Sequence, residues 1–572
     1  MFWLKGMIEI KKRIISVLAA VALIIGCTAS VFAELRQFPV ELDGIINEYP
    51  VVVCPGVASA WLYYGEDYES GQLVWDGINV NSLLPNLEKR MVDIIKAAVN
   101  LPFDKAESLA KVLAEEIEHT WEYMACNPDG TSKYDLDVCA FAAEDTTNFA
   151  LFNSGQHLAV YEQENTKTIS NYIGEENVYN FYVDWRMGAE YCAGKLDEYI
   201  QLVKEHSGKD KVNIFAVSQG GQMAATYLTL YGYKGDVENA VMSSPAIGGA
   251  GIAYDLFNAN VHLDEQVLAK MLELNFFIEE DYEWFIKALD IGIIDDLVNA
   301  MIPNLIDAMA YWGCLWDLVP TEYYEQLKAM YLTDPACAPL VEKSDRFHYE
   351  ILPSVTETFR YLNESGKAHI SIITGTGSRV ISGLDVYSDG IIPVSSATGA
   401  TCPVFGERFA DGYVQINECG GKDKLSPNMQ IDASTAYLPD NTWFSDGNFH
   451  GWTYWSPCTR TLAIELLLTS YIKDVYTDPR YPQFLTSDHM AYGVNFDFVS
   501  DVPGFVDSSC KSLVVKNVCD KATVRITAVY CKQTPITFDL AKPVTLAPGE
   551  SVTLDIIAGK LPKGKTCIDL TV

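Results

Sequence analysis

Residues 214–221 read Ile-Phe-Ala-Val-Ser-Gln-Gly-Gly, an apolar β-type run that ends at a serine with two glycines close behind it. A helical pattern follows. This order is typical of the nucleophile elbow, in which a strand turns sharply into a helix and presents a reactive serine. The turn is so tight that the residues two positions before and after the serine must be small, and Ala216 and Gly220 stand there. The segment predicts a nucleophile at Ser218; the plain alternative is a serine that only caps the helix.

Strand and helix patterns alternate on both sides of this segment. Continuous apolar runs bounded by turn residues predict buried strands, and amphipathic runs between them predict helices. Such alternation is typical of an α/β fold with a mainly parallel sheet that helices cover on both faces. The predicted strands lie within 50–56 and at 212–217, 239–243, 369–374 and 433–438, and the predicted helices at 188–206, 221–230, 355–362 and 459–471.

The alternation stops between about 252 and 350. This stretch is rich in Leu, Ile, Phe, Trp and Tyr at helical spacing and carries almost no strand signal. It predicts a helical insertion between two strands of the sheet. The insertion either packs on the core like any other helices or forms a cap that lines an apolar substrate pocket.

The pattern changes again after Val502-Pro503-Gly504. Short β-type runs separated by turn residues fill the rest of the chain. About 65 residues of this kind predict a small β-sandwich module. We therefore expect a large α/β domain over 34–502, with the helical cap at about 252–350, and a C-terminal β module over 503–572.

The N-terminus has the pattern of a signal peptide. Three basic residues, 11–13, precede an apolar run over 14–25, and Val31-Phe32-Ala33 forms a small-residue cleavage site. The apolar run is too short to span a bilayer, so we expect residues 1–33 to be removed and the protein to be secreted. The alternative is a lipobox at 24–27, which would make the chain a membrane-anchored lipoprotein through Cys27.

Composition excludes one class of function. The chain has 572 residues, with 41 Lys and Arg against 76 Asp and Glu, a net charge of −35. Such a chain lacks the basic surface that nucleic-acid binding needs, and uniform attraction to anionic membranes is disfavoured as well.

The cysteines permit disulfides whose pairing the sequence does not determine, and their spacing predicts no zinc site. There are 14 cysteines, and export permits disulfides. Four C-terminal cysteines could form two bridges in any of three pairings: Cys510, Cys519, Cys531 and Cys567. Without CxxC or HExxH spacing, no structural zinc site is expected.

A serine nucleophile needs an acid and a base that follow it in the order Ser, Asp, His. Asp389 lies beside Gly390 in a loop that comes after the strand at 369–374. Only two histidines follow it, His450 and His489. His450 stands between a strand-like and a helix-like run and suits the base better than His489. A turn-forming aspartate and a bystander histidine are the plain alternatives.

Two backbone N–H groups should stabilise the oxyanion. In such folds one belongs to the residue after the serine, here Gln219. The other comes from the loop after an early strand, and Val57 in Pro55-Gly56-Val57 is the candidate. Gly56 allows a reacting group to approach the backbone closely. An ordinary Pro-Gly turn is the alternative.

These pieces together resemble the lecithin:cholesterol acyltransferase-like family of α/β-hydrolases. Four stretches carry the resemblance, which spans about 50–470: the strand and Pro-Gly loop at 50–59, the Trp75…Leu83-Leu84-Pro85 stretch, Asp184-Trp185-Arg186, and Asp389-Gly390-x-x-Pro393. The resemblance implies a Ser-Asp-His esterase fold that acts on lipids or other acyl esters. It assigns Ser218 as nucleophile, Asp389 as acid and His450 as base.

We therefore expect a secreted serine hydrolase that cleaves carboxylic esters, with a lipid acyl ester as substrate, through an acyl-enzyme and without cofactor or metal. The alternatives are a short-chain or polysaccharide-acyl esterase, a peptidase, a polyester depolymerase, an acyltransferase, and a non-catalytic binding protein on the same fold. Association with a membrane or cell surface and the oligomeric state are left open.

Overall fold

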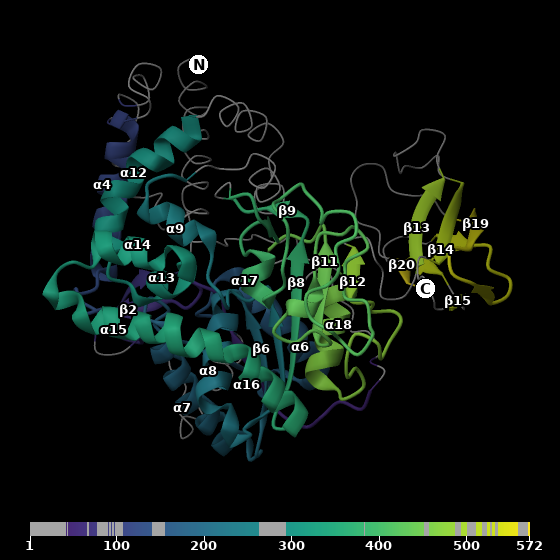
Figure 1. Ribbon diagram of the computed structural model, residues 1–572. Helices are drawn as coiled ribbons and strands as arrows, with labels where there is room; N and C mark the ends of the chain where they lie inside the picture. Colours follow the sequence, from purple (N-terminus) through teal and green to yellow (C-terminus); the bar gives the residue numbers. More distant parts are fainter. Residues whose placement is uncertain are drawn as a thin grey trace, which may run out of the picture.

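The structure is a computed structural model (Figure 1). It describes residues 42, 44–65, 68–76, 90, 93, 97, 107–139, 155–261, 293–381, 384–450, 457–486, 494–499, 511–517, 523–526, 529–531, 536–558 and 570–571. The predicted signal peptide with Cys27, the alternative base His489, the Leu-Leu-Pro stretch at 83–85 and the side chains of the four C-terminal cysteines lie outside these residues.

A seven-stranded sheet forms the centre of the molecule, with helices around it. Every pair of neighbouring strands in it runs parallel, which confirms the predicted α/β class. The strand order is β12 (Phe484–Thr486), β11 (Thr442–Asp446), β8 (His369–Thr376), β7 (Val237–Ser243), β6 (Val212–Val217), β1 (Val51–Cys54) and β5 (Val178–Asn180).

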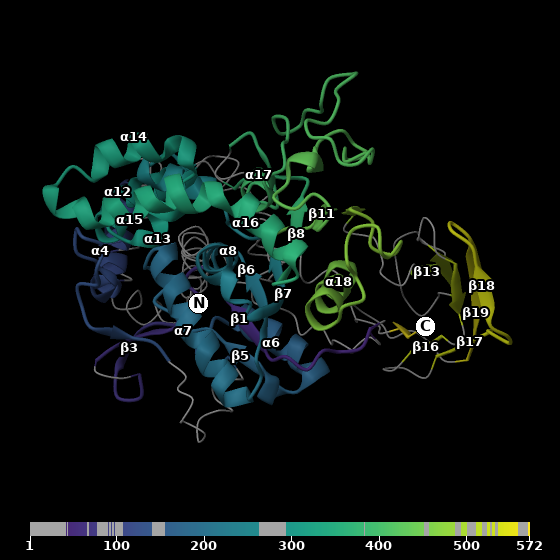
Figure 2. The same cartoon turned by 60° about the horizontal axis from the view of Figure 1, so that its bottom comes forward.

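The central strands are apolar throughout because both of their faces are covered. All residues of β1 and β6 are buried, and side chains alternate between two apolar clusters. One cluster packs against α7 (Ala189–Ser207), α8 (Gln219–Tyr231) and α16 (Leu352–Ser365). The other packs against α6 (Val160–Ile173) and α18 (Pro457–Leu468). Figure 2 shows these helices around the strands.

One predicted strand is wrong. The run at 433–438 contains the single 3₁₀ turn η6 (Ala433–Thr435) instead of a strand, and the sheet strand is β11, which begins at Thr442. Asp432 accepts a hydrogen bond from the Ser434 N–H and so caps a turn there, a local alternative that the apolar spacing did not reveal. His450 still follows a strand and precedes α18.

Every regular element that the structure describes in the insertion between β7 and β8 is helical, and residues 262–292 lie outside the described part. Its first helix packs on α12, which in turn packs on α4 (Glu107–Thr120). The insertion comprises α9 (Gly251–Phe257), α12 (Ile293–Met309), α13 (Gly313–Leu318), α14 (Thr321–Tyr331), η4 (Pro335–Cys337), α15 (Ala338–Arg346) and the π-helical turn η5 (Phe347–Ile351), which runs into α16.

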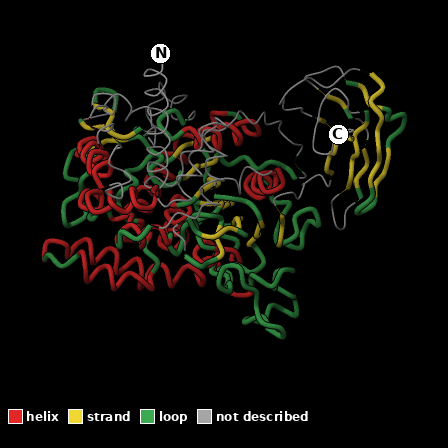
Figure 3. The backbone as a smooth tube through the Cα atoms, turned by 90° about the horizontal axis from the view of Figure 1, so that it is seen from above, coloured by secondary structure: helices red, strands yellow, loops and turns green. Residues whose placement is uncertain are grey.

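Short elements complete the main body. A three-stranded sheet has the order β3 (Gln72–Trp75), β2 (Leu62–Tyr64), β4 (Leu136–Asp137), and β9 (Ser378–Arg379) pairs with β10 (Tyr387–Ser388). The stretch from 399 to 432 follows α17 (Val394–Thr398) and is loop throughout (Figure 3). The remaining turns are η1 (Glu122–Met124), η2 (Glu175–Asn177) and η3 (Gly232–Lys234).

The C-terminal part is built of antiparallel strands with an apolar cluster of its own. Six strands have the order β13 (Val494–Val499), β14 (Ser512–Asn517), β19 (Ser551–Ala558), β17 (Thr537–Phe538), β16 (Tyr530–Cys531), β20 (Leu570–Thr571), and β15 (Val524–Ile526) pairs with β18 (Val544–Leu546). Because β13 pairs with β14, this sheet includes residues before 503. Figures 1 and 2 both show it beyond α18.

Candidate active site

Ser218 lies in a strained turn at the carboxyl end of β6. Its φ is 56° and its ψ is −123°, and α8 begins at the next residue. A positive φ is unfavourable for a residue with a side chain and is found where the surrounding structure enforces it, often at functional sites. Here the Ser218 carbonyl accepts hydrogen bonds from the N–H groups of Gly221, at 3.0 Å, and Ala246, at 2.9 Å.

The small residues behind the serine let α8 start directly against its neighbours. A Cβ on Gly220 would lie 2.5 Å from the Pro55 carbonyl oxygen and closer still to that of Cys54. A Cβ on Gly221 would lie 2.8 Å from the Cα of Pro245. Side chains at these positions would push α8 away from β1 and displace the serine.

His450 and Asp389 form a buried pair. The His450 Nδ1 lies 2.8 Å from the Asp389 Oδ2, and the His450 N–H donates to the Asp389 carbonyl at 2.7 Å. Both side chains are almost completely buried. With the Nδ1–H donated to the carboxylate, the Nε2 is left to act as a base, and it has no partner among the described residues.

The Asp389-Gly390-x-x-Pro393 segment shapes the carboxylate's surroundings. The other oxygen, Oδ1, accepts hydrogen bonds from the N–H groups of Ile391, at 3.0 Å, and Ile392, at 2.7 Å. Gly390 has a φ of 100°, and a Cβ on it would lie 2.6 Å from the Cδ2 of Phe449. A glycine is therefore needed where the acid's loop meets the histidine's loop.

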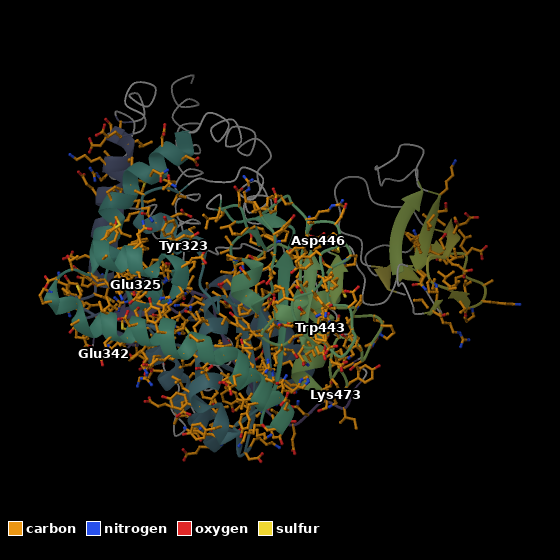
Figure 4. All side chains as sticks on the ribbon, in the orientation of Figure 1. Tyr323, Glu325, Glu342, Trp443, Asp446 and Lys473 are labelled. Carbon is orange, nitrogen blue, oxygen red and sulfur yellow. The ribbon has the colours of Figure 1, made fainter. Side chains whose placement is uncertain are left out.

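Figure 4 labels two residues of β11, the strand that precedes the loop with His450. Trp443 and Asp446 follow β11 to its carboxyl end, and the chain then enters the loop with His450. In the same view Tyr323 and Glu325 mark α14, and Glu342 marks α15, in the helical insertion. Ser218 and His450 thus follow the carboxyl ends of parallel strands of one sheet, the edge where α/β proteins place their sites.

The two candidate oxyanion donors are free. Neither the Val57 N–H nor the Gln219 N–H donates a hydrogen bond within the described part of the chain. A Cβ on Gly56 would lie 3.3 Å from the Cβ of Ser218, so the loop that carries Val57 passes beside the serine. The Gln219 side chain is anchored separately, by a 3.0 Å hydrogen bond from its Nε2 to the Trp185 carbonyl.

Glu162 is a buried carboxyl that the sequence reasoning missed. Its Oε1 accepts the Gly56 N–H at 2.8 Å, and its Oε2 accepts the Asn165 Nδ2 at 2.8 Å. Burial raises the pKa of Glu162 to about 7, although the hydrogen bonds from the Gly56 N–H and Asn165 and the electrostatic interaction with His450 oppose the rise. Glu162 therefore lies next to the serine's loop and within the electrostatic reach of the base.

The sequence signal for Glu162 is weak. On α6 it shares a buried face with Asn165, Thr166 and Ile169, at helical spacing. Three of these four residues are polar, so the pattern predicts an exposed face and not a buried one.

The Asp184-Trp185-Arg186 motif contacts the site through the Trp185 carbonyl, which accepts the Gln219 side chain. Arg186 is buried, forms an ion pair with Asp184 at 2.6 Å and donates to the Met124 carbonyl at 2.7 Å. Trp185 belongs to a closed ring of four buried tryptophans: Trp75, Trp121, Trp312 and Trp185. The ring centroids of neighbouring tryptophans lie 5.3–6.2 Å apart. This ring joins the insertion to the loop beside the serine.

A cavity of about 600 Å³ lies where the insertion meets the start of α7. Its lining is mixed, with carboxylates, lysines and tyrosines, and it includes neither Ser218 nor His450. Buried Asp317 closes one side. Its Oδ2 accepts the Ala189 N–H at 2.6 Å, its Oδ1 accepts the Ser344 hydroxyl at 3.0 Å, and burial raises its pKa to about 7.

The predicted site residues fall into two groups at one sheet edge. Val57, Ser218 and Gln219 form one, and Asp389 with His450 forms the other. No hydrogen bond joins the Ser218 hydroxyl to His450 in the described part of the chain; Glu162 adjoins both groups. Within the described residues, no group of three or more His, Cys, Asp or Glu side chains could hold a metal ion, and no helix is long and apolar enough to cross a membrane.

No protein-family model matches this chain, and no curated protein matches it either.

Proposed function

We propose that this chain is a secreted serine hydrolase of the α/β-hydrolase fold, similar to the lecithin:cholesterol acyltransferase-like family, that cleaves carboxylic esters. The observation that carries the proposal is the buried His450–Asp389 pair, 2.8 Å between Nδ1 and Oδ2, at the sheet edge where Ser218 occupies its strained turn. A serine, an aspartate and a histidine that follow one another in this chain order, at this edge of the sheet, are the residues that a catalytic triad of this fold requires.

The chemistry follows from these roles. His450 Nε2 accepts the Ser218 proton as the hydroxyl oxygen attacks the ester carbonyl, while Asp389 keeps the Nδ1–H pointing away and stabilises the imidazolium. The Val57 and Gln219 N–H groups bind the oxyanion of the tetrahedral intermediate. Removing one such donor typically costs about 10²–10³ in kcat. The protonated His450 then donates to the leaving alcohol, and water releases the acyl group.

A lipid acyl ester is the substrate we propose first. The insertion supports it, because it begins at the carboxyl end of β7, the edge at which Ser218 and His450 lie, and its helices contribute many buried apolar side chains to the core. An ester with a polar acid or alcohol portion is the second candidate. The mixed polar cavity beside the start of α7 favours it.

The C-terminal module has a separate role in this proposal. We propose that its two groups of antiparallel strands form a β-sandwich around their shared apolar cluster. Such a module can hold the secreted enzyme at a surface that carries its substrate.

Covalent labelling tests the proposal directly. A fluorophosphonate probe should label the wild-type protein at Ser218 and leave Ser218→Ala unlabelled. A non-catalytic binding protein on the same fold would leave both proteins unlabelled, and that result would overturn the proposal.

The choice of base is tested by measuring ester hydrolysis. His450→Ala should lose ester hydrolysis as severely as Ser218→Ala, because triad members act as a unit. His489→Ala should retain most of the activity. If His489→Ala loses the activity and His450→Ala keeps it, the base is His489.

A further inference from the structure

The loop beside the serine is held at both ends by side chains. At one end the Gly56 N–H donates to the Glu162 Oε1 at 2.8 Å. At the other end the Ala58 carbonyl accepts the Trp75 Nε1–H at 2.7 Å. The Val57 N–H lies between these two bonds and donates to nothing in the described part of the chain. A free donor fixed on both sides is what an oxyanion site requires, because the donor must not reorganise during the reaction.

This loop would not hold its conformation unaided. Gly56 has no side chain and rotates readily, and Ala58 has a φ of 62°, which is unfavourable for a residue with a Cβ. The Gly56 N–H is buried, and losing its acceptor would leave a buried donor unsatisfied. The loop would then relax and take the Val57 N–H with it.

Glu162 is far from the loop in sequence and contacts it only in the folded chain. It lies on α6, 106 residues after Gly56, and is completely buried. Its second oxygen accepts the Asn165 amide, and the ionisable groups that act with it electrostatically are His450 and the thiol of Cys54 on β1. The mechanism proposed above gives this carboxyl no role.

We propose that Glu162 is a positioning residue that holds the Gly56–Val57 peptide so that the Val57 N–H faces the oxyanion. The inference rests on the proposed function and deepens it. Glu162 does not touch the reacting atoms in this account; it acts through the backbone of Gly56. Its effect should therefore appear in the transition state and not in substrate binding.

Three substitutions at one position separate this role from packing. Glu162→Leu fills similar space but offers no acceptor. Glu162→Gln keeps an acceptor oxygen at the same reach and removes the charge. Glu162→Asp keeps the carboxyl but withdraws it by one methylene. Glu164→Ala, on the same helix but only partly buried, is the matched control.

We expect Glu162→Leu to lower kcat about 10- to 100-fold on a p-nitrophenyl ester, with KM within about twofold of wild type. This is part of the loss of about 10²–10³ that follows removal of a whole oxyanion donor. Binding of a boronic acid, which forms a tetrahedral adduct with the serine, should weaken by the same factor. Glu162→Gln should stay within about threefold of wild type, and Glu164→Ala should be unchanged.

Two results would overturn the inference. One is a folded Glu162→Leu with kcat within twofold of wild type; the other is a Glu162→Gln that falls as far as Glu162→Leu. If Glu162→Leu does not fold, Glu162→Asp is used to test the role instead. It should lower kcat with KM unchanged. A Glu162→Asp protein with the kcat of wild type would reject the role. Fluorophosphonate labelling of the wild type keeps the two proposals apart, because an unlabelled wild type rejects the proposed function itself.

Discussion

At the scale of single residues, Ser218 has a strained backbone conformation that the surrounding structure must stabilise. Its φ of 56° is natural for glycine and strained for any other residue, and such strain costs on the order of 1–3 kcal/mol. The strain persists because the turn's backbone is hydrogen-bonded on both sides, to β7 and to the start of α8.

This strain gives a prediction with two variants. Ser218→Ala and Ser218→Gly should both lose about 10⁴–10⁶ in kcat. Ser218→Ala should keep the thermal midpoint of wild type, because the hydroxyl forms no hydrogen bond in the described residues. Ser218→Gly should gain about 1 kcal/mol by relief of the positive φ, less the entropy that glycine adds to the unfolded chain. Thermal unfolding of both variants, measured beside activity, checks this; activity within tenfold of wild type in either would contradict it.

Asp317 gives a prediction on pH. Burial raises its pKa from 3.8 to about 7, so between these values the folded protein holds a proton that the unfolded chain has released. The stability it contributes is fully present below about pH 4 and is lost as pH rises to about 7, by roughly 4 kcal/mol. Asp317→Asn removes this dependence and can still accept the Ala189 N–H.

Urea unfolding at pH 4 and pH 8 measures the effect as a difference between proteins. The stability of Asp317→Asn relative to wild type should rise with pH across this window. Parallel pH profiles for the two proteins would contradict the shift. Glu162 acts in the same direction, because its pKa is raised from 4.5 to about 7.

The candidate triad residues could be named from sequence because their signals are local. The elbow is eight consecutive residues, the acid lies in a short glycine-containing loop, and only two histidines follow it. Glu162 could not be predicted, because its partner Gly56 is 106 residues away and its helix face looks polar. A buried carboxyl is defined by tertiary contacts that no short pattern contains.

At the scale of elements, the position of α8 depends on glycines at its start. Gly220→Ala would place a Cβ 2.5 Å from the Pro55 carbonyl and should force α8 away from β1. Overpacking of this kind costs about 1–3 kcal/mol, and the displaced serine should also lose activity. Gly194→Ala is the matched control: it lies inside α7, and its Cβ would meet only the Tyr231 hydroxyl at 3.8 Å.

The control should behave in the opposite way. Alanine is about 1 kcal/mol more favourable than glycine inside a helix, so Gly194→Ala should raise the free energy of unfolding and keep full activity. Denaturant unfolding and ester hydrolysis measure both variants. A Gly220→Ala protein as stable and active as wild type would show that α8 does not need the close approach.

Element boundaries were predicted best where burial is complete. The prediction of 212–217 coincides with β6, and that of 369–374 is contained in β8. Both strands are apolar runs covered on two faces. The failure at 433–438 has a different cause: these residues are mostly apolar or small, but Asp432 satisfies the backbone locally and the chain turns before β11. Periodicity does not report such local hydrogen bonds.

At the scale of the whole molecule, we propose that the insertion between β7 and β8 determines what can reach the serine. It leaves the sheet at the carboxyl end of β7, the edge at which Ser218 and His450 lie. The sequence indicated its helices from their spacing. It could not indicate whether the surface toward the serine is apolar or polar, because that depends on which helix faces meet after folding.

A series of p-nitrophenyl esters with acyl chains of increasing length distinguishes an apolar from a polar surface toward the serine. If apolar side chains of the insertion line the acyl site, each buried CH₂ contributes about 0.8 kcal/mol, and lengthening an ester from about four to eight carbons adds four such groups. At half burial this is about 1.6 kcal/mol, or roughly fifteenfold in kcat/KM if it is expressed in the transition state. We therefore expect kcat/KM to rise from butyrate to octanoate p-nitrophenyl esters. The mixed cavity beside α7 provides the opposing case, since carboxylates and lysines favour a polar group and would give no gain from added methylenes. A flat or falling series would assign the enzyme to short-chain or polysaccharide-acyl esters and leave Ser218, Asp389 and His450 in their roles.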